Sequence, residues 1–152
     1  MKTNTYISKQ LTNAIAQLEM VTGDVSATLA NAVPAGTANP IGASYAHALL
    51  SIDVMVNAAL QGGAPVVFAS GAAPKLGIAD PNPQNWGALK AITHDIAALN
   101  AYAANVRASV QAYTAKLTDA ELDRAFNFFG MDTTVADVLI LAATQAIIHA
   151  GD

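Results

Sequence analysis

The sequence contains no cysteine and few charged residues, and each shortage excludes a class of site or partner. Without cysteine there is no disulfide, no thiolate metal ligand and no cysteine nucleophile. Charged residues make up 12% of the chain, about half of the roughly 25% that is usual in soluble domains. The seven lysines and arginines are spread along the chain and the net charge is −4, so nucleic acid is not an expected partner.

Neither a secretion signal nor a membrane-spanning segment is predicted. The N-terminal residues 1–10, MKTNTYISKQ, lack the apolar segment that a signal peptide needs. The longest apolar run, residues 138–148, is interrupted by Gln145 and is too short to cross a bilayer. We therefore expect one soluble, cytoplasmic domain over residues 1–152, with no membrane partner.

Hydrophobic residues, in contrast, make up 53% of the chain. With so few charges available, a large share of the surface must be apolar or alanine-rich. Extended apolar surface favours association, so a homodimer is expected over a solitary monomer.

The spacing of the apolar residues predicts an all-α fold. They recur every three or four positions, the period of helices that bury one face. A short additional helix is predicted over residues 118–125, where Thr118 and Glu121 form a capping box, and a turn is predicted around Gly130. The four long helices are predicted over residues 5–32, 39–61, 86–117 and 134–151.

The connection between the second and third long helices, residues 62–85, is unusually long and contains four prolines. Two adjacent antiparallel helices need only a short loop, so this length indicates a crossover that leaves the two helices parallel. The predicted architecture is a four-helix bundle with up-down-down-up topology. Within the connection, residues 65–69 are expected to dock on the bundle through Phe68.

Two histidines and a glutamine lie on apolar faces of two predicted helices. His47 is near the start of the second helix, whereas Gln145 and His149 are four residues apart near the end of the fourth and share one helical face. The predicted topology makes these two helices antiparallel, which brings all three side chains to the same end of the bundle. Bundle cores hold metal sites, and imidazole suits Zn, Ni, Cu or Fe. The alternative is that both histidines are hydrogen-bonded core residues and that Gln145 is the amide that bonds one of them or the backbone.

The third histidine, His94, is excluded from this site by its helical phase. It lies two residues from both Ile92 and Ile96, on the opposite face of a helix that turns by about 100° per residue, so it is expected to be exposed. The sequence also lacks a Glu-x-x-His pair, a phosphate-binding glycine loop and a Gly-x-Ser-x-Gly elbow. These absences leave His47, Gln145 and His149 as the candidate metal site.

The sequence resembles the DinB/YfiT-like metalloenzyme family over nearly its whole length. The matching segments are NPIGASYAH at residues 39–47, TTVADVL at residues 133–139 and QAIIHAGD at residues 145–152. In that family, three histidines of the second and fourth helices hold a divalent metal. The resemblance implies that His47 and His149 are the first and third ligands. Gln145 occupies the position of the second histidine, and Asp152 the position of a glutamate.

Some members of that family use a low-molecular-weight thiol such as mycothiol or bacillithiol. The resemblance therefore implies a metal- and thiol-dependent transferase, isomerase or hydrolase with Ni, Zn or Fe, because a coordinated thiol has a lowered pKa and is presented as a thiolate. Because Gln145 stands where the family has its second histidine, the site can also be a degenerate one that has lost the family's activity. The alternative function is a non-catalytic helical bundle that acts as a dimeric binding or interaction protein. The sequence alone assigns neither a substrate nor a catalytic residue.

Overall fold

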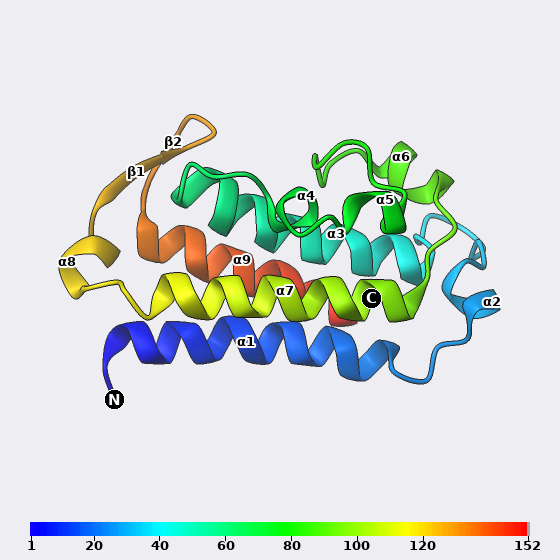
Figure 1. Ribbon diagram of the computed structural model, residues 1–152, viewed down its shortest axis with the longest axis horizontal. Coiled ribbons are helices and arrows are strands. Elements are labelled where there is room, and N and C mark those ends of the chain that lie inside the picture. The colour runs from blue at the N-terminus through cyan, green and yellow to red at the C-terminus, as the bar shows by residue number, and fades with distance from the viewer. Residues whose placement is uncertain (152) are drawn as a thin grey trace.

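The computed structural model of the chain describes residues 1–151 and is mostly helical, as the sequence predicts. Its four long helical segments lie lengthwise against one another (Figure 1). α1 and α9 run in one direction, and α3 and α7 run in the other. α1 packs against α9 and α7, and α3 also packs against α9 and α7. The segments are α1 (Thr3–Thr22), α3 (Ile41–Asp53) with its π-helical continuation η1 (Val54–Leu60), α7 (Ile96–Thr114) and α9 (Val135–Gly151).

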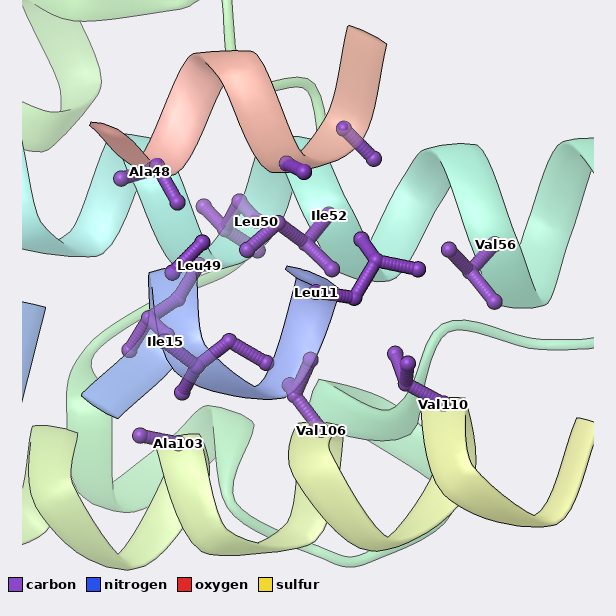
Figure 2. Close-up of a cluster of buried hydrophobic side chains, with 14 of the residues drawn as sticks. Leu11, Ile15, Ala48, Leu49, Leu50, Ile52, Val56, Ala103, Val106 and Val110 are labelled. Atoms are coloured by element: carbon purple, nitrogen blue, oxygen red, sulfur yellow. The ribbon is translucent and has the colours of Figure 1, made fainter. Parts of the chain in front are cut away.

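α3 is the most deeply buried helix of the bundle. Every residue from Gly42 to Asp53 is buried, so this helix is enclosed on all sides over these residues. Figure 2 shows apolar side chains of α1, α3 and α7 converging between the helices. Each fully buried leucine or isoleucine there contributes about 1.5–3 kcal/mol relative to an exposed position. The residues labelled in the figure are all fully buried: Leu11, Ile15, Ala48, Leu49, Leu50, Ile52, Val56, Ala103, Val106 and Val110.

One helical segment within residues 1–151, Ile41–Leu60, is long and apolar enough by length and composition to cross a membrane. Most of this segment is buried inside the bundle. Its apolar character is therefore explained by its place in the core, because a buried core helix can be as long and apolar as one that crosses a membrane.

The first helix is shorter than the prediction of residues 5–32. α1 ends at Thr22, and a separate one-turn helix, α2 (Ala27–Ala30), follows after a turn. Gly23 and Asp24 are poor helix formers, which favours an end at this point. Ser26 then opens α2 by accepting a hydrogen bond from the backbone N–H of Leu29 at 3.2 Å.

The predicted third helix, residues 86–117, is broken into α6 (Trp86–Ala91) and α7. Ile92 is extended at the break, with φ −86° and ψ 137°. The side chain of Asn31 fixes the broken segment, because its amide donates to the carbonyl of His94 at 2.9 Å and accepts from the N–H of His94 at 2.7 Å. Asp95 then caps α7 by accepting from the N–H of Ala97.

The prediction that His94 is exposed is therefore wrong, because the helical phase on which it rests does not continue through the break. His94 is only 4% exposed, and its ring Nε2 donates to the carbonyl of Leu89 at 2.8 Å. Burial lowers the pKa of His94 below its usual value, and the hydrogen bond to Leu89 opposes this effect. Gly42 provides the space for the ring, since a Cβ there would lie 2.6 Å from the His94 Cβ.

The long connection of residues 62–85 contains two short helices, α4 (Val66–Ala69) and α5 (Ala73–Leu76). It docks through Val67, which is fully buried, and not through Phe68, which is 39% exposed. The carboxylate of Asp53, buried at the end of α3, accepts the backbone N–H groups of Val66 at 2.7 Å and Val67 at 2.9 Å. This double hydrogen bond turns Val67 inward, so the prediction for Phe68 is wrong.

The segment after α7 contains two β-strands, so the prediction of a purely all-α fold is wrong in this part. The capping box of Thr118 and Glu121 is present, but its helix, α8 (Asp119–Leu122), ends before residue 125. The predicted turn is the tip of a hairpin in which β1 (Ala125–Phe128) pairs antiparallel with β2 (Met131–Thr134), so a small two-stranded sheet caps one end of the mostly helical fold. The turn residues Phe129 and Gly130 both have positive φ, 50° and 87°, as a type I′ turn requires.

Candidate functional site

His47 of α3 and His149 of α9 lie against each other. Their ring centroids are 4.5 Å apart and the ring planes meet at 80°. The contact follows from the antiparallel packing of the two helices, which brings the first half of α3 beside the last turns of α9. His47 is buried, whereas His149 is half-buried.

The backbone of the long connection orients the ring of His47. Its Nδ1 lies 2.7 Å from the carbonyl oxygen of Pro83. A carbonyl can only accept, so Nδ1 carries the proton and the lone pair of the neutral imidazole is on Nε2. Metal-binding histidines commonly have this arrangement, in which the second ring nitrogen donates to a backbone carbonyl. The hydrogen bond therefore selects the tautomer that a metal ligand needs.

Trp86, the first residue of α6, covers the histidine pair. Its ring stacks on His47 with centroids 4.2 Å apart, and it meets His149 edge-on at 6.1 Å. Asn85 holds the start of α6, because its side chain accepts from the N–H of Ala88 and donates to the carboxylate of Asp80. Hydrogen bonds from Asn82 and Asn85 lower the pKa of Asp80, so this carboxylate is ionised at neutral pH.

Gln145 lies one turn before His149 on α9 and is half-buried. It lines a cavity beside the histidine pair, and no hydrogen bond of its side chain is found within residues 1–151. The structure thus brings two of the three predicted ligands into contact and places the third one turn away. Across the described residues, no group of three or more His, Asp or Glu side chains is arranged to hold a metal ion.

The sequence matches the DinB superfamily over residues 10–152. The chain belongs to the DinB superfamily. Its fold is similar to that in the structure titled "Crystal structure of the conserved protein of locus from Enterococcus faecalis", with a TM-score of 0.82 and 20% sequence identity. The similarity covers 99% of this chain and 92% of that chain, and at this identity it shows the fold alone. A comparison with curated proteins gives no match.

Two cavities flank the histidine pair of this DinB superfamily protein. The first, here called the polar cavity, has a volume of about 440 Å³ and reaches His149. Burial raises the pKa of Tyr45 in its wall far above the usual value, so Tyr45 remains a neutral phenol. The other polar side chains of its wall are Thr22, Thr37, Asn39 and Ser44.

The second, here called the apolar cavity, has a volume of about 570 Å³ and lies between η1, α9, the end of the long connection and the tip of the hairpin. Gln145 and Ser51 are two of the few polar groups in its wall. Its apolar lining includes Val54, Met55, Phe128, Phe129 and Leu141.

Sequence reasoning on this DinB superfamily protein missed three residues that shape the site. Trp86 has a recognisable signal, because it is the only tryptophan and follows directly on the proline-rich connection. Asp53 also has one, because it is the only charged residue in the apolar stretch 39–61. Pro83 has none, because it acts through its backbone carbonyl, which every residue possesses.

Proposed function

We propose that this DinB superfamily protein binds a divalent transition metal, Ni, Zn or Fe, on an up-down-down-up four-helix bundle. The proposed ligands are His47 and His149, with Gln145 as a third and weaker one. The observation that carries the proposal is the hydrogen bond from His47 Nδ1 to Pro83 in a ring that contacts His149. It fixes the ligand tautomer of one histidine beside a second histidine.

The donor set suits such an ion but would hold it less tightly than three histidines. Imidazole nitrogen is a good donor for these metals, whereas the amide oxygen of Gln145 is a poor one. Three or fewer protein ligands leave coordination positions for water or a small molecule. When bound, the metal would lower the pKa of a coordinated water or thiol and so supply a nucleophile at neutral pH.

A low-molecular-weight thiol is the proposed second cofactor, and the proposed activity is that of a thiol-dependent transferase, isomerase or hydrolase. The support is the polar cavity, which reaches His149 and offers hydroxyl and amide groups from Thr37, Asn39 and Ser44. The hydroxyl of Tyr45 donates to Asn100 at 2.8 Å, so the hydrogen bonds that this cavity offers come from the other polar side chains. The protein is proposed to act in the cytoplasm on a small molecule, and neither on nucleic acid nor at a membrane, in keeping with its few cationic residues.

Metal analysis of untagged protein tests the proposal. We expect close to one Ni, Zn or Fe per chain in the wild type and its loss in His47→Ala and His149→Ala. Addition of Ni²⁺ to metal-free protein should also quench the fluorescence of Trp86, which stacks on His47 and is the only tryptophan. The control is His94→Gln, folded by circular dichroism, which should retain the metal. A wild type without metal, whose melting temperature does not respond to chelator, contradicts the proposal.

One observation favours the alternative function, a dimeric binding or interaction protein without catalysis. The outer face of α9 exposes three isoleucines, Ile140, Ile147 and Ile148. They lie at spacings of seven and eight residues and so share one side of the helix. We propose that this face forms the contact of a homodimer.

Sedimentation tests the dimer. Wild-type protein at tens of micromolar should sediment as a dimer, and Ile147→Asp should sediment as a monomer, because a buried unpaired carboxylate opposes an apolar contact. The control is Val33→Asp, which places the same charge on an exposed loop residue outside α9. If the wild type sediments as a monomer, the proposed dimer contact is wrong, whether or not the protein binds metal.

A further inference from the structure

The apolar cavity begins one helical turn away from both histidines. Ser51 follows His47 by four residues on α3, and Gln145 precedes His149 by four residues on α9. Both residues line the cavity. Because α3 and α9 are antiparallel, these two steps lead in the same direction along the bundle, toward the hairpin (Figure 1). The cavity therefore continues the face that carries the histidines.

The next turn of each helix makes the cavity apolar. Met55 lies eight residues after His47, and Leu141 lies eight residues before His149. The volume of about 570 Å³ is typical of sites for small molecules, which combine an apolar wall with a few polar groups. One of these groups is Ser51, whose Oγ is buried and makes no hydrogen bond within residues 1–151. A buried hydroxyl of this kind can be satisfied by a ligand.

The charge of the wall narrows the class of ligand. Neither lysine nor arginine is among the residues that line the cavity, and the only ionisable side chain is the carboxylate of Asp80. Its lowered pKa keeps it negative at neutral pH. An anionic group is therefore disfavoured in this cavity, and the largely apolar wall favours an uncharged group.

The conformation of Phe129 at the hairpin tip independently indicates that this cavity binds an apolar group. It is the only non-glycine residue with positive φ in residues 1–151, and its side chain is 80% exposed while it lines the cavity. The left-handed conformation costs a residue with a Cβ roughly 1–2 kcal/mol, and Asn or Gly is usual at this turn position. Local strain of this kind is commonly kept where the side chain has a binding role. The ring also contacts Phe128 edge-on, with centroids 4.7 Å apart.

We propose that the apolar cavity binds the uncharged, apolar part of a small-molecule ligand, roughly the size of a naphthyl group, and that Phe129 contacts this part. The polar end of the ligand lies against Ser51 and Gln145, toward the histidines. The reaction of that polar end rests on the proposed metal function, but the binding of the apolar part does not.

Binding of N-phenyl-1-naphthylamine, an uncharged aromatic dye, tests the proposal. The wild type should bind the dye saturably with enhanced emission. Leu141→Asn should weaken binding by about tenfold, because it places an amide in the apolar wall. The matched control is Leu29→Asn, the same change at an exposed leucine of α2 that does not line the cavity, which should bind as the wild type does. Equal affinity in the wild type and Leu141→Asn, or equal weakening by Leu29→Asn, overturns the proposal.

Phe129→Asn separates binding from stability. Asn-Gly is the preferred type I′ sequence, so the melting temperature should stay the same or rise by about 2–4 °C, while dye affinity falls by about threefold or more because the aromatic contact is lost. Unchanged dye affinity in this variant contradicts the role of Phe129. All measurements are made with and without chelator. Dye binding as expected in a protein that holds no metal refutes the metal function alone, and metal binding without this dye response refutes the cavity proposal alone.

Discussion

Gln145→His is expected to tighten the binding of Ni²⁺ or Zn²⁺ by at least about tenfold, or ~1.4 kcal/mol. Position 145 shares the face of α9 with His149 and lies one turn before it, so an imidazole there would reach the same site. An imidazole nitrogen is a much better ligand for these ions than an amide oxygen, and a third histidine completes a set that catalytic zinc sites use. Competition with a chromophoric chelator, together with quenching of Trp86, would measure the change.

The neighbouring position provides the control for this experiment. Thr144→His adds the same side chain at an exposed position of α9 and should leave the affinity unchanged, since it points away from His149. If Gln145→His binds metal no more tightly than the wild type, position 145 does not belong to the metal site. The family resemblance would then extend to His47 and His149 only.

Asp53→Ala is expected to lower the free energy of unfolding by about 3–5 kcal/mol, because it leaves several buried donors without an acceptor. The fully buried carboxylate accepts four hydrogen bonds. The donors are the N–H groups of Val66 and Val67, the amide of Asn57 at 2.8 Å and the hydroxyl of Tyr102 at 2.6 Å. Burial, followed by the charge of Asp53 and this hydrogen bond, raises the pKa of Tyr102 well above its usual value, so the phenol remains a donor.

Urea denaturation measures the fall in the free energy of unfolding, and two further variants provide comparisons. Tyr102→Phe removes one of the four donors and should cost about 1 kcal/mol. Asp24→Ala removes an exposed carboxylate and should change the free energy of unfolding by less than about 0.5 kcal/mol. A loss below about 1 kcal/mol in Asp53→Ala would mean that water replaces the carboxylate without penalty, which a buried site does not allow.

The helices of this fold could be predicted from sequence because their apolar faces repeat regularly, but the breaks between them could not. Leu89, Ile92, Ile96 and Leu99 keep a helical period straight through the interruption between α6 and α7. The interruption depends on Asn31, more than sixty residues away along the chain, and such a contact leaves no local signal. The hairpin was missed for a related reason, because its turn has phenylalanine where Asn-Gly would have marked it.

The candidate site was predictable to the extent that it depends on helical spacing. The positions of His47 and His149 on apolar faces, with an antiparallel arrangement, were sufficient to expect their contact. The groups that orient the rings come from the irregular connection, where neither periodicity nor composition predicts which carbonyl meets a histidine. Gln145 shows the same limit, because spacing places it on the correct face but does not specify whether its side chain reaches the ion.

Hydrogen bonds join the long connection, residues 62–85, to α3 at two places. Asp53 holds the backbone of Val66 and Val67, and His47 holds the carbonyl of Pro83. Both sets of hydrogen bonds come from the same buried helix, and the bond from His47 to Pro83 couples the order of the connection to the orientation of the His47 ring. By thermodynamic linkage, an ion that selects this orientation stabilises the ordered connection by the same free energy with which the ordered connection favours the ion. We therefore expect the affinity for the proposed metal to depend on residues that make no contact with it.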